Sequence, residues 1–381
     1  MTTPGITAHI DGRGSVIPTL PMITSRFMEL RRRRGLMIAL AVVTVALPAV
    51  FLAVRLLLHA ISPHTYGPAG GYNIFTGLVV GVLYTLGFLV AATLGATAGS
   101  VDLTEGMFRH LVVTGRSRIA LYLARIPAGL AIIVPLVAIG FSIVCVVCVF
   151  AAPKQQSFDG VSVPAGLSRM QLETFASAHP EEVLCDLPAF NVNVAVPCQA
   201  QGPGPAGPGG PGTSGPNGPV IIGRSGPTGP ASAAQVRAAA IHVADQYYSE
   251  YKMQFLTPPV SLMVKTGLWL ELEAAIGFLV GLGLGSLIGQ RTVAMVLMIV
   301  LEIILTPIVL RVQIPHMINL QRAVIGVATA HLEPSQLPLA FGGGGHDYRV
   351  TETTTTAVIV VLAWVIGWSI LGAWRMRTRD A

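Results

Sequence analysis

Apolar and polar residues alternate along this chain in long blocks rather than residue by residue. Six apolar runs, each long enough for a helix to cross bilayer hydrocarbon, lie at about 36–57, 73–98, 126–151, 266–288, 293–310 and 353–374. A helix satisfies its own backbone hydrogen bonds, which lipid cannot do. The pattern therefore predicts an all-α membrane protein with six transmembrane helices, the first kinked at Pro48.

The polar blocks between these runs divide the chain into regions. We predict a cytoplasmic N-terminus at 1–35 and a first set of three spans at 36–151. A large extracytoplasmic insertion at 152–265 follows, then three more spans at 266–375 and a cytoplasmic tail at 376–381. A second polar excursion at 312–355 precedes the last span, and a short amphipathic helix is expected in it at His316–Ala330.

Composition supports a membrane location. Only 11% of the 381 residues are charged and 52% are hydrophobic, against about a quarter charged in soluble domains. The net charge of +6 does not indicate nucleic-acid binding, because the arginines flank the apolar runs. If both termini are in the cytoplasm, the arginines form the positive-inside pattern expected of a multi-pass protein of the cell membrane.

The N-terminal region ends in a basic cluster directly before the first span. Ser25–Arg34 is expected to form an interfacial helix in which Phe27 and Leu30 face lipid and Arg31–Arg34 meet anionic headgroups. The alternative is a plain topology signal without a helix of its own. The length of the polar lead argues against a cleavable signal peptide.

A charged segment at 99–125 separates the second and third spans. Each of its charges would cost roughly 2.5–3.5 kcal/mol at mid-bilayer, so we expect the segment in water on the cytoplasmic side. Before it, glycine pairs at 77/81 and 95/99 have the spacing of close helix packing. The charged residues are Asp102, Glu105, Arg109, Arg116, Arg118 and Arg125.

The insertion carries two features of its own. Cys185 and Cys198 are a possible disulfide if the region is extracytoplasmic. The glycine- and proline-rich stretch at 202–230 breaks the collagen triplet register, so we interpret it as a disordered, semi-extended spacer. A helix is predicted at 231–255. Cys145 and Cys148 lie in a span, where they are expected to act as small apolar residues.

Motifs for catalysis are missing from the sequence. It has no GxxxxGK[ST], HExxH or GxSxG motif and no His/Cys pattern with zinc spacing. We therefore predict no catalytic, cofactor or metal site and no enzyme activity in this chain. An acid inside a span is a functional candidate. Glu302 is the deepest, lining a translocation path or pairing within the bundle, whereas Glu271 and Glu273 are placed near the outer end of their span.

The order of these elements resembles the membrane subunit of type-2 ATP-binding-cassette (ABC) transporters, the exporter-type permeases, especially actinobacterial ones. The likeness rests on a basic lead, two spans, and then a motif formed by Asp102, Gly106, Arg109, Leu111, Val112, Val113, Gly115, Arg116 and Arg118. It implies that 102–118 is a coupling helix, in which Asp102, Glu105, Gly106, Arg109, Arg116 and Arg118 contact a separate ATP-binding subunit.

The resemblance further implies dimerisation with a second permease subunit, the same or homologous, around a substrate path. ATP and Mg would then be bound by the partner ATPase. The insertion at 152–265 departs from the usual core. Two other classes remain open: a membrane-anchored receptor or cell-surface protein acting through 152–265, and an ion-driven transporter, which would need inverted repeats and several midplane charges.

Overall fold

The computed structural model describes most of the helical chain. The described residues are 17–62, 66, 69–104, 117–152, 155–158, 161–164, 167–180, 183–184, 194–196, 220–222, 232–255, 257–312, 314–334, 337 and 350–378. They divide into two units. Unit 1 comprises Met1–Leu57, Phe75–Val147 and Pro259–Ala381, and unit 2 comprises Leu58–Ile74 and Cys148–Pro258.

Six helices are long and apolar enough to cross a membrane: Arg34–Ile61, Tyr72–Val101, Arg118–Phe150, Val260–Ile288, Arg291–Leu310 and Thr354–Thr378. The predicted number and order of spans are thereby confirmed. The largest differences in bounds are early starts, at Arg118 for the third span and at Val260 for the fourth. Lys265 is exposed and lies five residues from the start of the fourth span, where a lysine side chain can reach the membrane interface.

The spans are built from α-helices with π-helical turns inserted in three of them. The first span is α2 (Arg34–Ala41), η1 (Val42–Ala46) and α3 (Leu47–Ile61), and the second is α5 (Tyr72–Leu78), η2 (Val79–Tyr84) and α6 (Thr85–Thr104). The third is α8 (Arg118–Leu123) and α9 (Arg125–Phe150), and the fourth is α13 (Val260–Ile288). The fifth is α14 (Arg291–Ile299), η3 (Val300–Leu305) and α15 (Thr306–Arg311), and the sixth is α18 (Thr354–Thr378).

Local chemistry accompanies each π-helical turn. The irregularity expected near Pro48 is a π-helical turn in the five residues from Val42 to Ala46. After η2 and η3, a threonine hydroxyl donates to the carbonyl five residues earlier: Thr85 to Val80 at 3.3 Å and Thr306 to Leu301 at 2.9 Å. These hydroxyls supply donors to carbonyls that lie away from the regular α-helical ladder.

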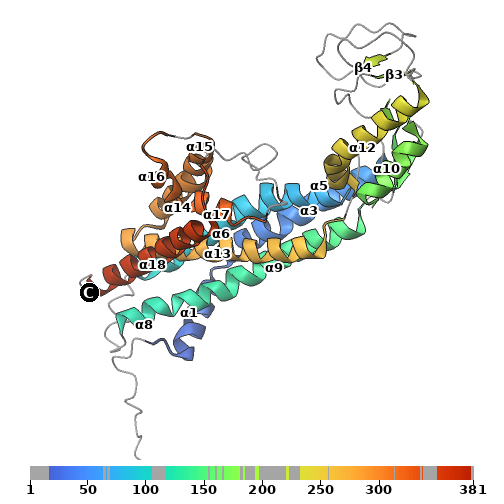
Figure 1. The fold of residues 1–381 in the computed structure, drawn as a ribbon. Helices are drawn as coiled ribbons and strands as arrows, with labels where there is room; N and C mark the ends of the chain where they lie inside the picture. Colours follow the sequence, from blue (N-terminus) through green and yellow to red (C-terminus); the bar gives the residue numbers. More distant parts are fainter. Residues whose placement is uncertain are drawn as a thin grey trace, which may run out of the picture. The chain divides into compact units, whose positions relative to one another are not determined.

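Close packing of α6 on α13 forms the centre of unit 1, and α18 packs on the same α13 (Figure 1). A Cβ at Gly281 would lie 2.4 Å from the Ala92 carbonyl oxygen, and one at Gly95 would lie 2.1 Å from that of Phe278. The predicted close packing at 95/99 is confirmed. It is wrong for Gly77 and Gly81, where a Cβ would meet nothing within 4 Å.

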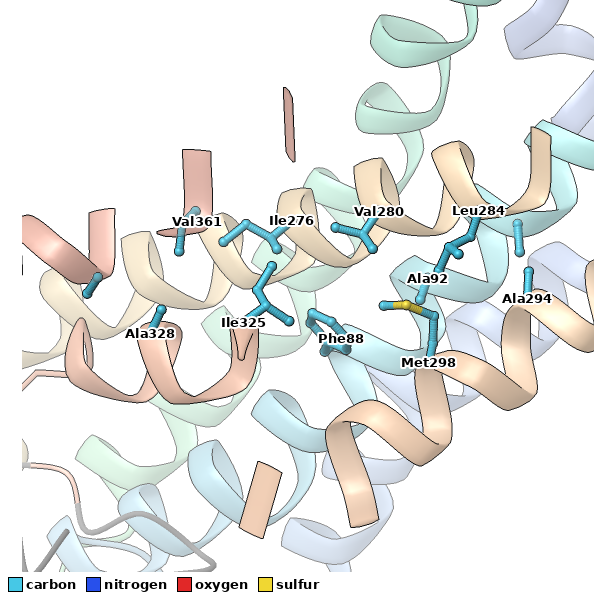
Figure 2. Close-up of a cluster of buried hydrophobic side chains, with 12 residues drawn as sticks. Phe88, Ala92, Ile276, Val280, Leu284, Ala294, Met298, Ile325, Ala328 and Val361 are labelled. Carbon is cyan, nitrogen blue, oxygen red and sulfur yellow. The ribbon is translucent and has the colours of Figure 1, made fainter. Parts of the chain in front are cut away.

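Two short helices between the fifth and sixth spans complete this core. The single helix predicted at His316–Ala330 is instead α16 (Ile318–Arg322) and α17 (Ile325–His331). The predicted amphipathic character is also wrong for α17, because its residues from Ile325 to Ala330 are all buried. Figure 2 shows Ile325 and Ala328 within the cluster formed with Phe88 and Ile276.

A helix is present in the N-terminal region, as predicted, over α1 (Leu20–Arg32). Leu30 is only 4% exposed and therefore does not face lipid as predicted. Met22 packs with Ala120, Leu121 and Ala124 of the third span, so α1 is held by protein contacts along one face.

Unit 2 is organised by α10 (Arg169–Ala178) and α12 (Ala233–Phe255), which pack side by side (Figure 1). Leu172, Ala176, Ala240 and Val243 are among the residues of their shared core. The helix predicted at 231–255 is confirmed. Two strand pairs complete the described part: β1 (Gln155–Phe158) with β2 (Val161–Pro164), and β3 (Val194–Val196) with β4 (Val220–Ile222), both antiparallel.

Candidate functional site

The two candidate regions from the sequence are the charged segment before the third span and the intramembrane acids. Glu105, Gly106, Arg109 and Arg116 lie outside the described residues. Asp102 belongs to α6, although its side chain is not among those described. The possible disulfide of Cys185 and Cys198 also lies outside, whereas Cys145 and Cys148 remain thiols.

The charged segment is shorter than predicted, because helix continues into both of its ends. Residues up to Thr104 belong to α6, and α8 begins at Arg118. Arg125 is 2% exposed instead of lying in water. Its guanidinium is accommodated because Nη1 donates to the Gly99 carbonyl at 3.2 Å, which gives the buried charge a polar partner.

The helix ends on both sides of the segment are tied to other spans through backbone carbonyls. The Gly99 carbonyl also accepts from Ser286 Oγ of α13 at 3.4 Å, so α6, α9 and α13 meet at one oxygen. On the other side, Arg118 Nη1 donates to the Arg377 carbonyl of α18 at 3.2 Å. A displacement of the charged segment would therefore act on several spans at once.

The acid that the sequence placed deepest, Glu302, is paired within the bundle. It is 2% exposed, and the Tyr84 hydroxyl donates to its Oε1 at 3.1 Å. This hydrogen bond is a pairing within the bundle of the kind that the sequence left open, and a role in a translocation path stays a prediction. Both residues occupy π-helical turns, Tyr84 in η2 and Glu302 in η3, and such turns are frequent at functional sites.

A second buried acid, Glu273, lies in the same interior. It is 1% exposed and interacts electrostatically with Glu302 and Glu333. Both of its carboxyl oxygens lack a hydrogen-bond partner among the described residues, as does Oε2 of Glu302. The Thr329 hydroxyl acts on Glu273 and also donates to the Gly326 carbonyl at 3.3 Å.

Aromatic residues and α17 surround these buried acids. The Tyr84 and Trp269 rings stack at 4.8 Å between centroids and 14° between planes. Trp269 Nε1 donates to the Thr329 carbonyl at 3.3 Å, which joins α13 to α17. Gly326 passes so close to the fifth span that a Cβ there would lie 2.8 Å from Glu302 Oε2.

Another acid lies just before the last span. The Glu352 side chain is fully buried, and its Oε2 is 3.9 Å from His331 Nδ1 at the end of α17. Burial raises the pKa of the Glu352 carboxyl above its ordinary value, while the nearby His331 and Arg322 oppose that rise. Arg322 Nε donates to the Thr351 carbonyl at 2.9 Å, which fixes the chain next to this acid.

Sequence reasoning found Glu302 but missed its neighbours. The sequence placed Glu273 near the outer end of its span, yet α13 begins at Val260, so Glu273 lies about 20 Å along the helix. Trp269, Glu273 and Gly277 are spaced by four, and this shared helix face was the available signal. Glu271 is half-buried on another face, in agreement with the expectation that both acids cannot face one groove.

No ligand set for a metal ion occurs among the described residues, because no three His, Cys, Asp or Glu side chains converge there. Glu273 and Glu302 are a polar cluster within an apolar bundle. Comparisons of the chain with protein-family models, with curated proteins and with solved structures found no match.

Proposed function

We propose that this chain is the membrane-spanning permease subunit of an ATP-driven ABC transporter of the exporter type, exporting a substrate that the sequence does not identify. A separate ATPase subunit would dock on the cytoplasmic side at 99–125 and supply the energy. Support comes from the six candidate spans and from the arginine-bearing segment between the second and third. The resemblance of residues 102–118 to the coupling motif favours this function over other membrane roles.

The observation that carries the proposal is the Gly99 carbonyl that Arg125 and Ser286 share. Because these donors belong to the third and fourth spans, a push on the end of α6 would reach both. Rigid-body motion of packed helices is a common way to transmit such a displacement. The chain has no phosphate-cradling loop, so ATP and Mg would bind to the partner.

A second permease subunit, the same or homologous, would complete the transporter within the lipid bilayer. The last span leaves a broad apolar face open, on which Ile359, Ile366 and Ile370 are at least half exposed. Lipid and a second subunit would both be suited to this face. Nucleic acid is not an expected partner.

The experiment purifies the full chain from its native membrane and identifies co-purifying subunits that carry GxxxxGK[ST]. With that complex, Arg109→Glu and Arg116→Glu are expected to abolish stimulation of ATP hydrolysis by the permease. Arg237→Glu is the matched control, because Arg237 lies exposed on α12 of unit 2. Normal stimulation in both charge reversals would refute the proposed docking site.

A membrane-anchored receptor or cell-surface protein is the second candidate. Unit 2 favours it, because α10 and α12 have a hydrophobic core of their own. Deleting 152–265 separates the two functions. A transporter is expected to keep ATPase coupling without this region, whereas a receptor that acts through it would lose ligand binding and have no ATPase to couple.

A further inference from the structure

The interior acids Glu273 and Glu302 have a use that the proposed function does not require. We propose that the two carboxyl groups form a proton-binding site inside the bundle. The site is protonated while α17 is packed in the bundle, and loss of the proton releases α17 from that packing. The proton is exchanged with water. The inference rests on the packing of α17 and is independent of any ATPase partner.

Ionised carboxylates would be costly at the buried positions of Glu273 and Glu302. Glu273 and Glu302 are 1% and 2% exposed, and three of their four carboxyl oxygens have no hydrogen-bond partner among the described residues. An isolated ionised carboxylate in an apolar interior is far more costly than a neutral acid. Two interacting carboxylates in one interior cannot both ionise cheaply.

No positive charge offsets that cost among the described groups that act on the two acids. The titratable groups that act on Glu273 are Glu302 and Glu333, and Tyr84 acts on Glu302 and interacts with both acids. None of these described partners is a Lys, Arg or His. His331, at the far end of α17, lies 2.8 Å through its Nδ1 from the Val327 carbonyl and 3.9 Å from Glu352 Oε2, and it is not among the groups that act on Glu273 or Glu302.

A bound metal ion would be the other way to neutralise the acids. The described residues contain no group of three converging ligands, and metal ions such as Ca²⁺ take six or more oxygen ligands. Protons need no such ligand set, because each carboxyl group can bind its own proton and become neutral. The Tyr84 hydroxyl already donates to Glu302 Oε1 at 3.1 Å.

The packing of α17 against the acids links their protonation to the conformation of α17. Gly326 lies directly against Glu302 Oε2, and Thr329 lies beside Glu273. The other walls, η2, η3 and α13, belong to membrane spans, whereas α17 has only seven residues and crosses nothing. When the acid gives its proton to water, the carboxylate left behind requires solvation, and α17 is the wall that can move to admit it.

The test measures how well a cysteine on α17 is protected, in the full chain reconstituted in lipid. Ala328→Cys places a thiol at a fully buried position of α17, and Leu320→Cys places one at an exposed position of α16. Labelling by N-ethylmaleimide is quantified at each site by peptide mass spectrometry. The ratio of the two rates cancels the ordinary dependence of thiol reactivity on pH.

The expected result is that the ratio of labelling at 328 to labelling at 320 rises with pH, by up to about tenfold per unit for one linked proton. In the Glu273→Gln, Glu302→Gln double variant the ratio stays low at all pH values, because neither side chain can ionise. Glu271→Gln, on another face of α13, is the matched control and keeps the rise. A ratio independent of pH in the otherwise native chain would overturn the proposal.

Infrared spectroscopy tests the proton directly and does not depend on the variants folding. The otherwise native chain should show a protonated carboxyl C=O band that shifts in D₂O and disappears over the pH range in which position 328 becomes reactive. The band should weaken in either single Gln variant and persist in Glu29→Gln. Absence of the band at low pH, where position 328 is protected, would show that both acids are ionised in the packed state and would refute the proposal.

Discussion

The Tyr84 hydroxyl and Glu302 Oε1, 3.1 Å apart, join two π-helical turns that belong to different spans. Each turn breaks the regular helical spacing where its polar side chain faces the interior. The hydrogen bond therefore links the second and fifth spans at the points where their helices are least regular.

Removing the Tyr84 hydroxyl should destabilise the bundle. Tyr84→Phe preserves the ring that stacks on Trp269 but leaves Glu302 Oε1 without its donor. The expected cost is about 1–3 kcal/mol, the typical penalty for an unsatisfied buried group. Denaturant unfolding in detergent measures it. In a double-mutant cycle with Glu302→Gln, independent effects that simply add would show that the pair contributes nothing.

Adding one methyl group at Gly326 should disturb the packing of α17 against the fifth span. In Gly326→Ala the new Cβ would lie 2.2 Å from Thr306 Oγ1 and 2.8 Å from Glu302 Oε2, so these buried side chains or the helices that carry them must shift. We expect a loss of about 1–3 kcal/mol in the free energy of unfolding.

Gly367→Ala is the matched control, because its Cβ would meet nothing within 4 Å. A gain of about 0.5–1 kcal/mol is expected there from helix propensity. Equal effects of the two substitutions on thermal unfolding would contradict close contact at Gly326.

Arg125 should matter more than other arginines at the ends of the spans. Arg125→Ala removes a donor to the Gly99 carbonyl, and the expected destabilisation is about 1.5–3 kcal/mol because the donor is charged and buried. Arg291→Ala, at the exposed start of α14, should change stability by less than about 0.5 kcal/mol. Thermal unfolding of both variants in the same detergent makes the comparison, and similar values would refute a special role for Arg125.

The stability of the region around α17 should depend on pH through Glu352. Since burial raises the pKa of this carboxyl in the folded chain, its contribution to stability is complete at acid pH and is lost as pH rises through the folded value. Glu352→Gln should therefore gain stability relative to the native chain at neutral and alkaline pH. At acid pH the difference between the two chains should be constant.

Unfolding curves collected across the pH range measure this difference. Because His331 lies 3.9 Å from Glu352, the comparison is repeated with His331→Gln in both chains. A difference of opposite sign, with Glu352→Gln losing stability as pH rises, would mean that the ionised acid is favoured in the fold.

The capping box of α10 gives a local prediction in unit 2. The backbone N–H of Ser168 donates to Gln171 Oε1 at 2.9 Å, and the Gln171 N–H donates to Ser168 Oγ at 3.4 Å. Ser168→Ala should cost about 1 kcal/mol and speed hydrogen exchange in the first turn of α10. Ser177→Ala, whose hydroxyl bonds only within the last turn, should leave that first turn unchanged.

The number of spans could be predicted from the sequence because their signal is local: a long run without charge crosses hydrocarbon. Glu302 was identifiable for the same reason. The position of Glu273 was not, because the polar residues before Thr266 suggested a later helix start. The structure extends α13 to Val260 with Lys265 exposed, which moves Glu273 toward the middle.

Features that depend on packing between helices could not be predicted from the sequence. The residues of α17 are small or apolar with scattered polar positions, a pattern typical of a surface helix, yet α18 and α15 pack against them and bury them. The π-helical turns have no composition signal. The burial of Arg125 depends on a carbonyl 26 residues away, which only the folded bundle brings near.

The hydrogen bond from Arg125 to the Gly99 carbonyl joins the span before the charged segment to the span after it. The segment is therefore tied together at its base, and Arg118 adds a second attachment, to α18. Loss of the Arg125 side chain would consequently open this base as well as weaken the packing of the spans.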